Sequence, residues 1–452
     1  MLNKIFKLDR NATTVTTELL AGLTTFITMA YILAVMPTIL ADTGMNKEAV
    51  FFATCLGIGF VSIAMGFFAN LPVALGPSLG LGAYFVAIVT QADGIPWQTA
   101  LGAVFVSGGI LFILTAIRVR QILVDAIPSS LKHALTVGIG FFLTFIGLRM
   151  SHLVEAVTHV GPSLDAINAS NGVAHLAFFE WNLNLSSFSN PDTLLVLIGL
   201  AITSVFVVSN VRGAVLLGIV ISTLIGIPLG LTNIHDIHFG LPSWQNLNIG
   251  VLDIRGALNL SMFSVIFTFV FVGLMDTFGT LISTTHKAGI LDKPGSKRII
   301  GRAMLVDSIG SCFGAFLGSP TLTEYLESIV GISAGGRTGL TAVTTGILFL
   351  LSLFLSSLFI IIPNAATAPA LILLGAFMLS SVHNIDFKDF SEGMPAFLTI
   401  ILMPLTYSIA NGISAGITFY VLLKVATGKW RVVHWLMYVL TALIVLRFVC
   451  FN

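Results

Sequence analysis

Charge is what this 452-residue sequence has least of. Asp, Glu, Lys and Arg together make up 9% of it, whereas an ordinary soluble domain carries about 25%. This scarcity excludes a soluble enzyme. The 21 basic and 20 acidic residues leave a formal net charge of +1, without the clustered Lys and Arg that nucleic-acid binding requires. We therefore expect no nucleic-acid partner.

Cysteine is also scarce, with only Cys55, Cys312 and Cys450 in the chain. Each lies in an apolar segment without a CxxC pair or a neighbouring His, so we expect buried thiols rather than metal or redox chemistry. No nucleophile with an adjacent base appears, and the loops are too short for a catalytic domain. The sequence thus predicts no enzyme activity, no cofactor and no metal site.

Apolar residues are abundant, at 56% of the chain. One crossing of a bilayer takes about 20 of them, and we predict an all-α polytopic membrane protein with fourteen spans. The first seven lie near residues 17–40, 50–70, 75–92, 98–117, 131–150, 192–209 and 213–230. The second seven lie near residues 260–284, 298–318, 319–333, 338–362, 366–383, 393–410 and 412–427.

The two sets of spans align with each other. Gly44 matches Gly289 at an offset of 245 residues, and Pro77 matches Pro320 at 243. The offset then drifts slowly, reaching 235 where Pro128 matches Pro363. Such ordered matches indicate an internal duplication. Because each half has an odd number of spans, the two repeats must be inverted relative to each other.

The basic residues predict a cytoplasmic N-terminus in the cytoplasmic membrane, because Lys and Arg concentrate in inner loops. The connection over 151–191 has no Lys or Arg, so we interpret it as an outer loop. After span 14, residues 434–450 form a further apolar segment. We interpret it as a helix along the inner face, with a fifteenth span as the alternative. The residues assigned to the inner side are Lys4, Lys7, Arg10, Arg118, Arg120, Lys132, Lys287, Lys293, Lys297, Arg298, Arg302, Lys424, Lys429 and Arg431.

Gly and Pro interrupt the helical pattern at corresponding places in the two halves, over 70–83 and 314–328. Such breaks free backbone N–H and C=O groups that lipid cannot satisfy. Matched broken spans therefore indicate a binding site near the middle of the membrane. The alternative is that these residues are kinks that allow close helix packing.

Ionisable residues within spans are costly and are functional candidates by default. Four acids qualify, Asp276, Asp307, Glu324 and Glu327, and no Lys or Arg joins them deep in a span. We expect Glu327 to accept hydrogen bonds from the N–H groups of a heterocycle. Glu324, three residues earlier, lies on a neighbouring face of the same half-helix or caps its start.

The two remaining acids have different expected roles. Asp276, in the segment FVGLMDTFGT, either carries a proton or holds the backbone of a broken span in place. For Asp307, in LVDSIGS, we expect a structural role in which it binds backbone groups at a neighbouring break.

Several segments resemble those of a known family, the adenine/guanine/hypoxanthine permease branch of the nucleobase/ascorbate transporter superfamily. They are AGLTTFITMAYILAVMPTILADTGM, NLPVALGPSLGLGAYF, IPWQTALGAVFVSG, TLTEYLESIVGISAGGRTGLTAVTTG and PAFLTIILMPLTYSIANGIS. The resemblance covers nearly the whole chain. It implies two inverted seven-span repeats, with short strands in the broken spans 3 and 10.

The resemblance also implies a division into two domains. The core domain comprises residues 17–117 and 260–362, which contain spans 1–4 and 8–11. The gate domain comprises residues 131–230 and 366–427, which contain spans 5–7 and 12–14. Family analogy further implies homodimers that form through the gate domains.

By the same analogy, the base binds between the two strands and span 8. Glu327 then looks like the substrate glutamate, and Asp276 and Glu327 like the proton-coupling acids. Gly273 replaces the first of two acids that relatives usually carry on span 8, and Gly82, Met36 and Glu324 also depart from the family pattern. The residues expected at the substrate are Glu327, Tyr325, Leu326, Glu324, Gly80, Leu81, Gly82, Gly273 and Thr277.

The function implied by the resemblance is proton-coupled uptake of a purine base, namely hypoxanthine, guanine or adenine. Two alternatives remain open from the residues themselves. One is a uracil, xanthine or anion transporter on the same fold. The other is a channel or sensor that binds a base without concentrating it, suggested by the missing acid at Gly273.

Overall fold

A computed structural model describes residues 2–90, 94–117, 120, 126–151, 153–160, 179–185, 190–232, 247–290 and 295–450. Over these residues the chain is mostly helical and contains two small sheets of two strands each. Ten of the described helices are long and apolar enough to cross a membrane, and four shorter apolar helices accompany them. This confirms a mostly helical fold of the polytopic membrane type.

The first half of the chain runs from the N-terminus to the segment before residue 233. Its helices and strands are α1 (Leu2–Phe6), η1 (Asp9–Asn11), α2 (Val15–Met29), α3 (Ile32–Ala41), α4 (Lys47–Phe68), β1 (Leu75–Pro77), α5 (Leu79–Thr90), α6 (Trp97–Ala116), α8 (Ser129–Met150), β2 (Val154–Val160), β3 (Phe179–Leu185), α10 (Pro191–Val208) and α11 (Ala214–Gly226).

The second half begins with two short helical segments that lead into a long helix. Its elements are α12 (Ile254–Ala257), η4 (Leu260–Met262), α13 (Phe263–Lys287), α14 (Ser296–Leu317), β4 (Leu322–Glu324), α15 (Ser328–Ser333), α16 (Gly339–Leu351), η5 (Ser352–Leu355), α17 (Ser356–Ile360), α18 (Asn364–Leu379), η6 (Ser380–Asn384), α19 (Phe390–Leu405), α20 (Ile409–Ala426), η7 (Trp430–Val432) and α21 (Trp435–Cys450).

The first span is divided into α2 and α3 at Ala30 and Tyr31. The amides of Leu33 and Ala34 donate to the carbonyls of Ala30 and Tyr31, three residues back, at 3.1 and 3.0 Å. Such bonds tighten the turn relative to an α-helix. Pro37 inside α3 removes another donor from the same span. The break leaves Tyr31, which is 1% exposed, in the interior of the bundle.

Strands β1 and β4 lie within the two segments in which Gly and Pro predict breaks. They pair antiparallel, with Leu75 opposite Glu324 and Pro77 opposite Leu322. All six strand residues are buried. Because a strand in the bilayer must pair its backbone groups within the protein, each segment satisfies the backbone groups that the other leaves free. Two segments about 250 residues apart are thereby fixed at the centre of the molecule.

The contacts between helices divide them into two groups. In one group, α4 packs on α16 and α14 packs on α6. In the other, α8 packs on both α18 and α19, and α18 packs on α10. Contacts between the groups include α5 with α8, α3 with α18, α2 with α11 and α13 with α20. Small residues allow the close approaches, since a Cβ on Gly339 of α16 would overlap the backbone of Gly66 in α4.

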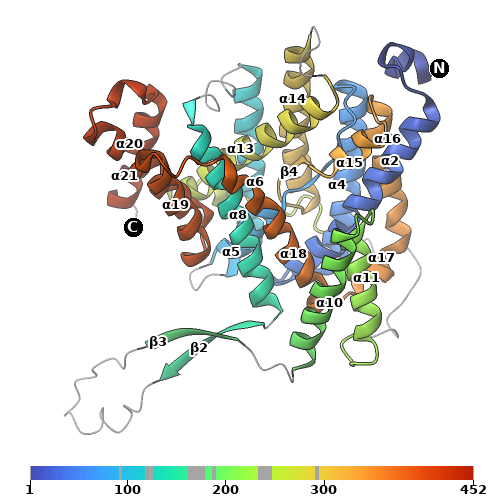
Figure 1. The fold of residues 1–452 in the computed structure, drawn as a ribbon, viewed down its shortest axis with the longest axis horizontal. Helices are drawn as coiled ribbons and strands as arrows, with labels where there is room; N and C mark the ends of the chain where they lie inside the picture. The colour runs from blue at the N-terminus through green and yellow to red at the C-terminus, as the bar shows by residue number, and fades with distance from the viewer. Residues whose placement is uncertain are drawn as a thin grey trace.

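Two features outside the bundle differ from a simple series of spans. Strands β2 and β3 form an antiparallel pair within the segment that we interpret as an outer loop, and they project away from the helices (Figure 1). The sequence does not predict this pair. The C-terminal helix α21 has 16 residues and is therefore about 24 Å long. It packs against α20, and its position relative to the bilayer stays a prediction.

Candidate functional site

Glu327 lies between β4 and α15, immediately before the helix, where the chain turns from strand to helix. It is the N-cap residue of α15, but its side chain accepts no capping bond. Its Oε1 instead accepts a hydrogen bond from the hydroxyl of Tyr31, at the break of the first span. The residue is partly buried, and the bond from Tyr31 fixes the position of its carboxylate.

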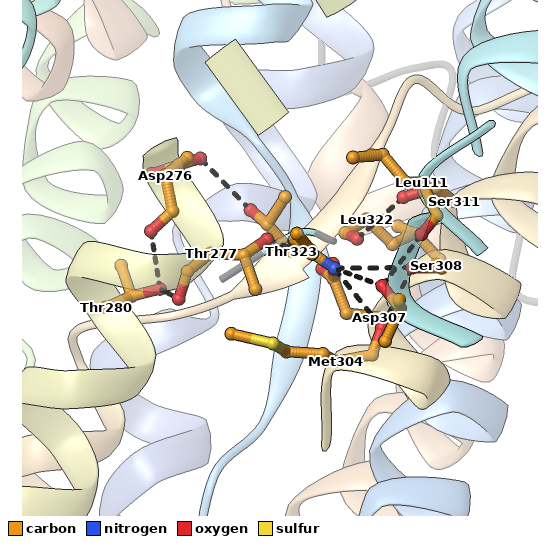
Figure 2. A network of polar contacts seen from close by, with 12 residues as sticks. Leu111, Asp276, Thr277, Thr280, Met304, Asp307, Ser308, Ser311, Leu322 and Thr323 are labelled. Carbon is orange, nitrogen blue, oxygen red and sulfur yellow. Dashed lines mark hydrogen bonds and ion pairs between the residues drawn. The ribbon is translucent and has the colours of Figure 1, made fainter. Parts of the chain in front are cut away.

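Asp276 joins both broken segments to α13. Its Oδ2 accepts hydrogen bonds from the hydroxyl of Ser78, between β1 and α5, at 2.9 Å and from that of Thr323 in β4 at 3.3 Å. Figure 2 shows the contact with Thr323. Of the two roles left open for Asp276, holding the broken spans in place matches this geometry, through side-chain hydroxyls rather than backbone groups. Asp276 also interacts electrostatically with Glu327.

The two strands are fastened by side chains as well as by backbone bonds. The hydroxyl of Tyr325, which is 6% exposed, donates to the carbonyl of Pro77. The hydroxyl of Ser328 accepts the amide of Ala74 at 3.1 Å, and the amide of Tyr325 donates to the carbonyl of Ala74 at 3.0 Å. Tyr325, placed at the substrate by the sequence, is therefore part of the frame of the site.

The expected role of Asp307 needs correction. Its Oδ2 does not bind backbone groups but accepts the guanidinium of Arg120 and the hydroxyl of Thr277, each at 3.0 Å. Arg120 and Asp307 are both 1% exposed. The sequence places Arg120 in a loop and expects no Lys or Arg among the buried acids. That prediction is wrong for Asp307, because the long arginine side chain reaches inward from beyond the end of α6.

Thr277, expected at the substrate, takes part in this ion pair instead. Its hydroxyl donates to Asp307 while the adjacent Asp276 accepts from Thr323, so consecutive residues of α13 bind different partners (Figure 2). The guanidinium of Arg120, the other partner of Asp307, also donates to the hydroxyl of Ser308 and the carbonyl of Met304, each at 3.3 Å.

Glu324 is the last residue of β4 rather than a member of the half-helix. It therefore neither shares a helix face with Glu327 nor caps α15, whose N-cap residue is Glu327. Glu324 is 2% exposed, and neither of its carboxylate oxygens has a hydrogen-bond partner among the described residues. Its electrostatic neighbours are Asp307, Arg120 and Asp276.

The remaining predicted residues lie around this centre. Gly80 and Gly82 are buried in α5, where a Cβ would lie 2.7 Å from Ile139 and 3.1 Å from Met36, respectively. Leu81 is fully buried, and its Cδ1 would lie 3.7 Å from a Cβ on Gly273. Leu326 is 47% exposed.

The sequence missed three residues of this region, Tyr31, Ser78 and Arg120. Ser78 lies inside the segment that the broken-span pattern marks, and its hydroxyl could have been found there. Tyr31 is a polar side chain within an apolar run, six residues before Pro37, which is a weak signal.

Among the described residues, no three His, Cys, Asp or Glu side chains are grouped to hold a metal ion.

The fold has a counterpart among solved membrane domains. It resembles the transmembrane domain of the bicarbonate transporter BicA from a cyanobacterium, with a TM-score of 0.64 at 17% sequence identity. The match covers 89% of this chain and 97% of the BicA domain. At this level of identity the similarity concerns the arrangement of the chain and not its ligand.

Sequence comparison gives the family. Residues 16–415 match the model of the permease family, and the chain belongs to that family. It is 41% identical to the adenine permease AdeQ of Escherichia coli over 452 residues, covering 99% of this chain and 96% of AdeQ. It is 37% identical to the guanine/hypoxanthine permease PbuO of Bacillus subtilis over 442 residues, covering 95% and 96%. These relatives confirm the family resemblance and agree with a transport protein rather than an enzyme.

Proposed function

We propose that the protein is a secondary active transporter that takes up a purine base together with protons across the cytoplasmic membrane. The base is adenine, guanine or hypoxanthine, the ligands named for the relatives AdeQ and PbuO. Transport follows alternating access, in which the site opens to one side of the membrane at a time. The N-terminus lies in the cytoplasm.

The observation that carries this proposal is the meeting of two acids at the β1–β4 pair. Glu327 and Asp276 come from different parts of the chain and interact electrostatically, beside the hydroxyls of Tyr31, Ser78 and Thr323. A purine carries ring N–H donors, and a hydrogen bond from such a donor to a carboxylate is stronger than one between neutral groups.

An inverted duplication of seven spans is supported by matched helix contacts. If α2–α3, α4, α5 and α6 correspond to α13, α14, α15 and α16, then the α4–α16 contact has its counterpart in α14–α6. The α2–α15 contact likewise corresponds to α13–α5, and α2–α16 to α13–α6. In the other group, α8–α19 corresponds to α18–α10. A repeated pattern of this kind follows from two copies of one unit related by a twofold axis.

The two packing groups then serve as core and gate domains, with the site on the core side of their boundary. Contacts across the boundary include the close approach of Gly80 in α5 to Ile139 in α8. Rocking of one domain against the other at such small residues would open the site alternately to each side. We further propose that two copies associate through their gate domains.

Uptake of radiolabelled bases by proteoliposomes tests the proposal. Glu327→Gln keeps the size of the side chain but removes its charge, which weakens a charge-assisted hydrogen bond by about 1.5–3 kcal/mol. Uptake at low substrate concentration should fall by about 10- to 150-fold. Glu48→Gln, in the first turn of α4, is the matched control and should transport normally. Wild-type uptake by Glu327→Gln would contradict the assigned site.

Two further measurements separate the alternatives. A panel of unlabelled purines, uracil, xanthine and anions, added in competition, identifies the ligand class. A protonophore should abolish accumulation, whereas removal of sodium should not. Accumulation that follows sodium would contradict proton coupling, and equilibration without accumulation would indicate a channel or sensor.

A further inference from the structure

Glu324 lies in an unusual electrostatic setting for a carboxyl group inside a membrane protein. It is 2% exposed, and both oxygens are without a hydrogen-bond partner among the described residues. An ionised carboxylate without donors in such an interior carries a large desolvation cost, which the neutral acid avoids. This group is not part of the frame that holds the substrate site.

The register of β4 turns Glu324 away from the substrate side. Successive residues of a strand point to opposite faces, and Thr323 points to Asp276. Leu322 and Glu324 therefore share the other face. Leu322 packs against Gly57 of α4 and Gly314 of α14, and α14 carries Asp307.

The charged groups around Glu324 provide no positive charge that would balance its ionised form. The titratable and charged groups that interact with Glu324 are Asp307, Arg120 and Asp276. Arg120 neutralises Asp307 through their ion pair at 3.0 Å. An ionised Glu324 would then be an unbalanced negative charge beside that pair. Asp307 Oδ1 is also buried without a hydrogen-bond partner among the described residues, so the acceptor oxygens of this region outnumber the donors that reach them.

We propose that Glu324 is the carboxyl that binds and releases the coupling proton, with Arg120 and Asp307 as a fixed pair that sets its charge balance. The proton adds to one carboxylate oxygen and leaves from it unchanged, and no other bond forms or breaks. The site is separate from Glu327, which lies beyond β4 at the start of α15 and is bonded to Tyr31. The inference rests on the proposed function for its role in transport, but the protonation itself does not.

Infrared difference spectroscopy in lipid vesicles tests the protonation without any substrate. The wild-type protein should show the carbonyl band of a protonated carboxyl group, which disappears as the pH is raised. Glu324→Gln should lack this band, and Glu48→Gln should keep it. Asp307→Asn should also remove the band, because the charge of Arg120 would no longer be neutralised by Asp307 and would keep the neighbouring Glu324 ionised at neutral pH. A band that persists in Glu324→Gln would overturn the proposal.

Transport by the same proteoliposomes tests the coupling. Glu324→Gln imitates the protonated state, so exchange of labelled for unlabelled purine should stay within about threefold of the wild type. Accumulation driven by a pH gradient should fall at least tenfold. Equal accumulation by wild type and Glu324→Gln would overturn the coupling role. If the wild type moves no purine in either assay, the proposed function fails, while the infrared result still decides whether Glu324 binds a proton.

Discussion

The two faces of strand β4 carry acids of opposite character. On one side, Asp276 of α13 accepts hydrogen bonds from two hydroxyl groups. Glu327, in the turn that follows the strand, accepts one from Tyr31. On the other side, Glu324 of the strand itself has no hydrogen-bond partner within the described residues, beside the Arg120–Asp307 pair. Two acids held by hydroxyl groups thus lie close to an acid held by none.

Under the proposed function, this difference corresponds to separate sites for the substrate and the proton. Hydroxyl groups that donate to a carboxylate fix its position and leave its remaining lone pairs to a ligand. A carboxyl without donors has only a proton to satisfy it. Placing the two functions on opposite faces of a rigid strand would let the proton affect the site through β4 without competing with the substrate for one side chain.

Loss of the buried Arg120–Asp307 pair, on the Glu324 side of β4, should have the largest effect of the variants considered, and the effect should be on stability. Arg120→Gln removes the only described basic partner of Asp307, and removing one member of a buried ion pair costs about 3–5 kcal/mol. We expect a large fall in the thermal unfolding midpoint in detergent. The double variant Arg120→Met with Asp307→Leu should recover much of it, since no unpaired charge remains. An unchanged midpoint in Arg120→Gln would show that the pair does not stabilise the fold.

Tyr31→Phe should have the next largest effect, in this case on substrate binding at Glu327. The variant removes the hydroxyl that donates to Glu327, and hydrogen bonds to charged groups contribute about 1.5–3 kcal/mol. Because the hydroxyl orients the carboxylate for the substrate, we expect the KM for the purine to rise by about tenfold or more with little change in maximal rate. A lower KM would instead mean that the hydroxyl competes with the substrate.

The broken spans could be predicted from the sequence, but the faces of their strands could not. Gly and Pro in matched positions mark where the helix stops, and β1 and β4 lie there. Which way Glu324 points depends on the register with β1, and a slip of one residue would exchange the two faces. That register is set by contacts distant in sequence, such as Leu322 on Gly57 and Gly314.

Arg120 escaped prediction for a related reason. Basic residues near span ends usually belong to inner loops, and nothing in the local sequence distinguishes Arg120 from Arg118. Its role depends on an aspartate 187 residues away. The pattern of apolar runs therefore predicts which segments cross the bilayer, whereas pairing between distant side chains decides how the acids inside it are used.

The variants Ser78→Ala and Thr323→Val compare the two hydroxyl groups that donate to Asp276, one directly after β1 and one in β4. Each variant removes one hydroxyl donor, which is worth about 1 kcal/mol. We expect Ser78→Ala to reduce uptake about fivefold and Thr323→Val to reduce it less, because the Ser78 bond is 2.9 Å long and the Thr323 bond 3.3 Å. Initial rates in proteoliposomes measure both. The reverse order would place the main support of Asp276 on β4.

Asp389, at the N-cap of α19, is a carboxylate outside the spans that accepts hydrogen bonds. Its replacement should have the smallest effect on stability of the variants considered. The hydroxyl of Ser391, and then its amide, donate to Asp389 and lower its pKa from 3.8 to about 2. A depressed pKa means that the stabilisation is complete above pH 3.8 and is lost as the pH falls through about 2. Asp389→Asn should therefore lower the unfolding midpoint slightly at pH 5, and the gap to the wild type should close toward pH 2. A gap that is constant over this range would mean that ionisation of Asp389 contributes nothing to stability.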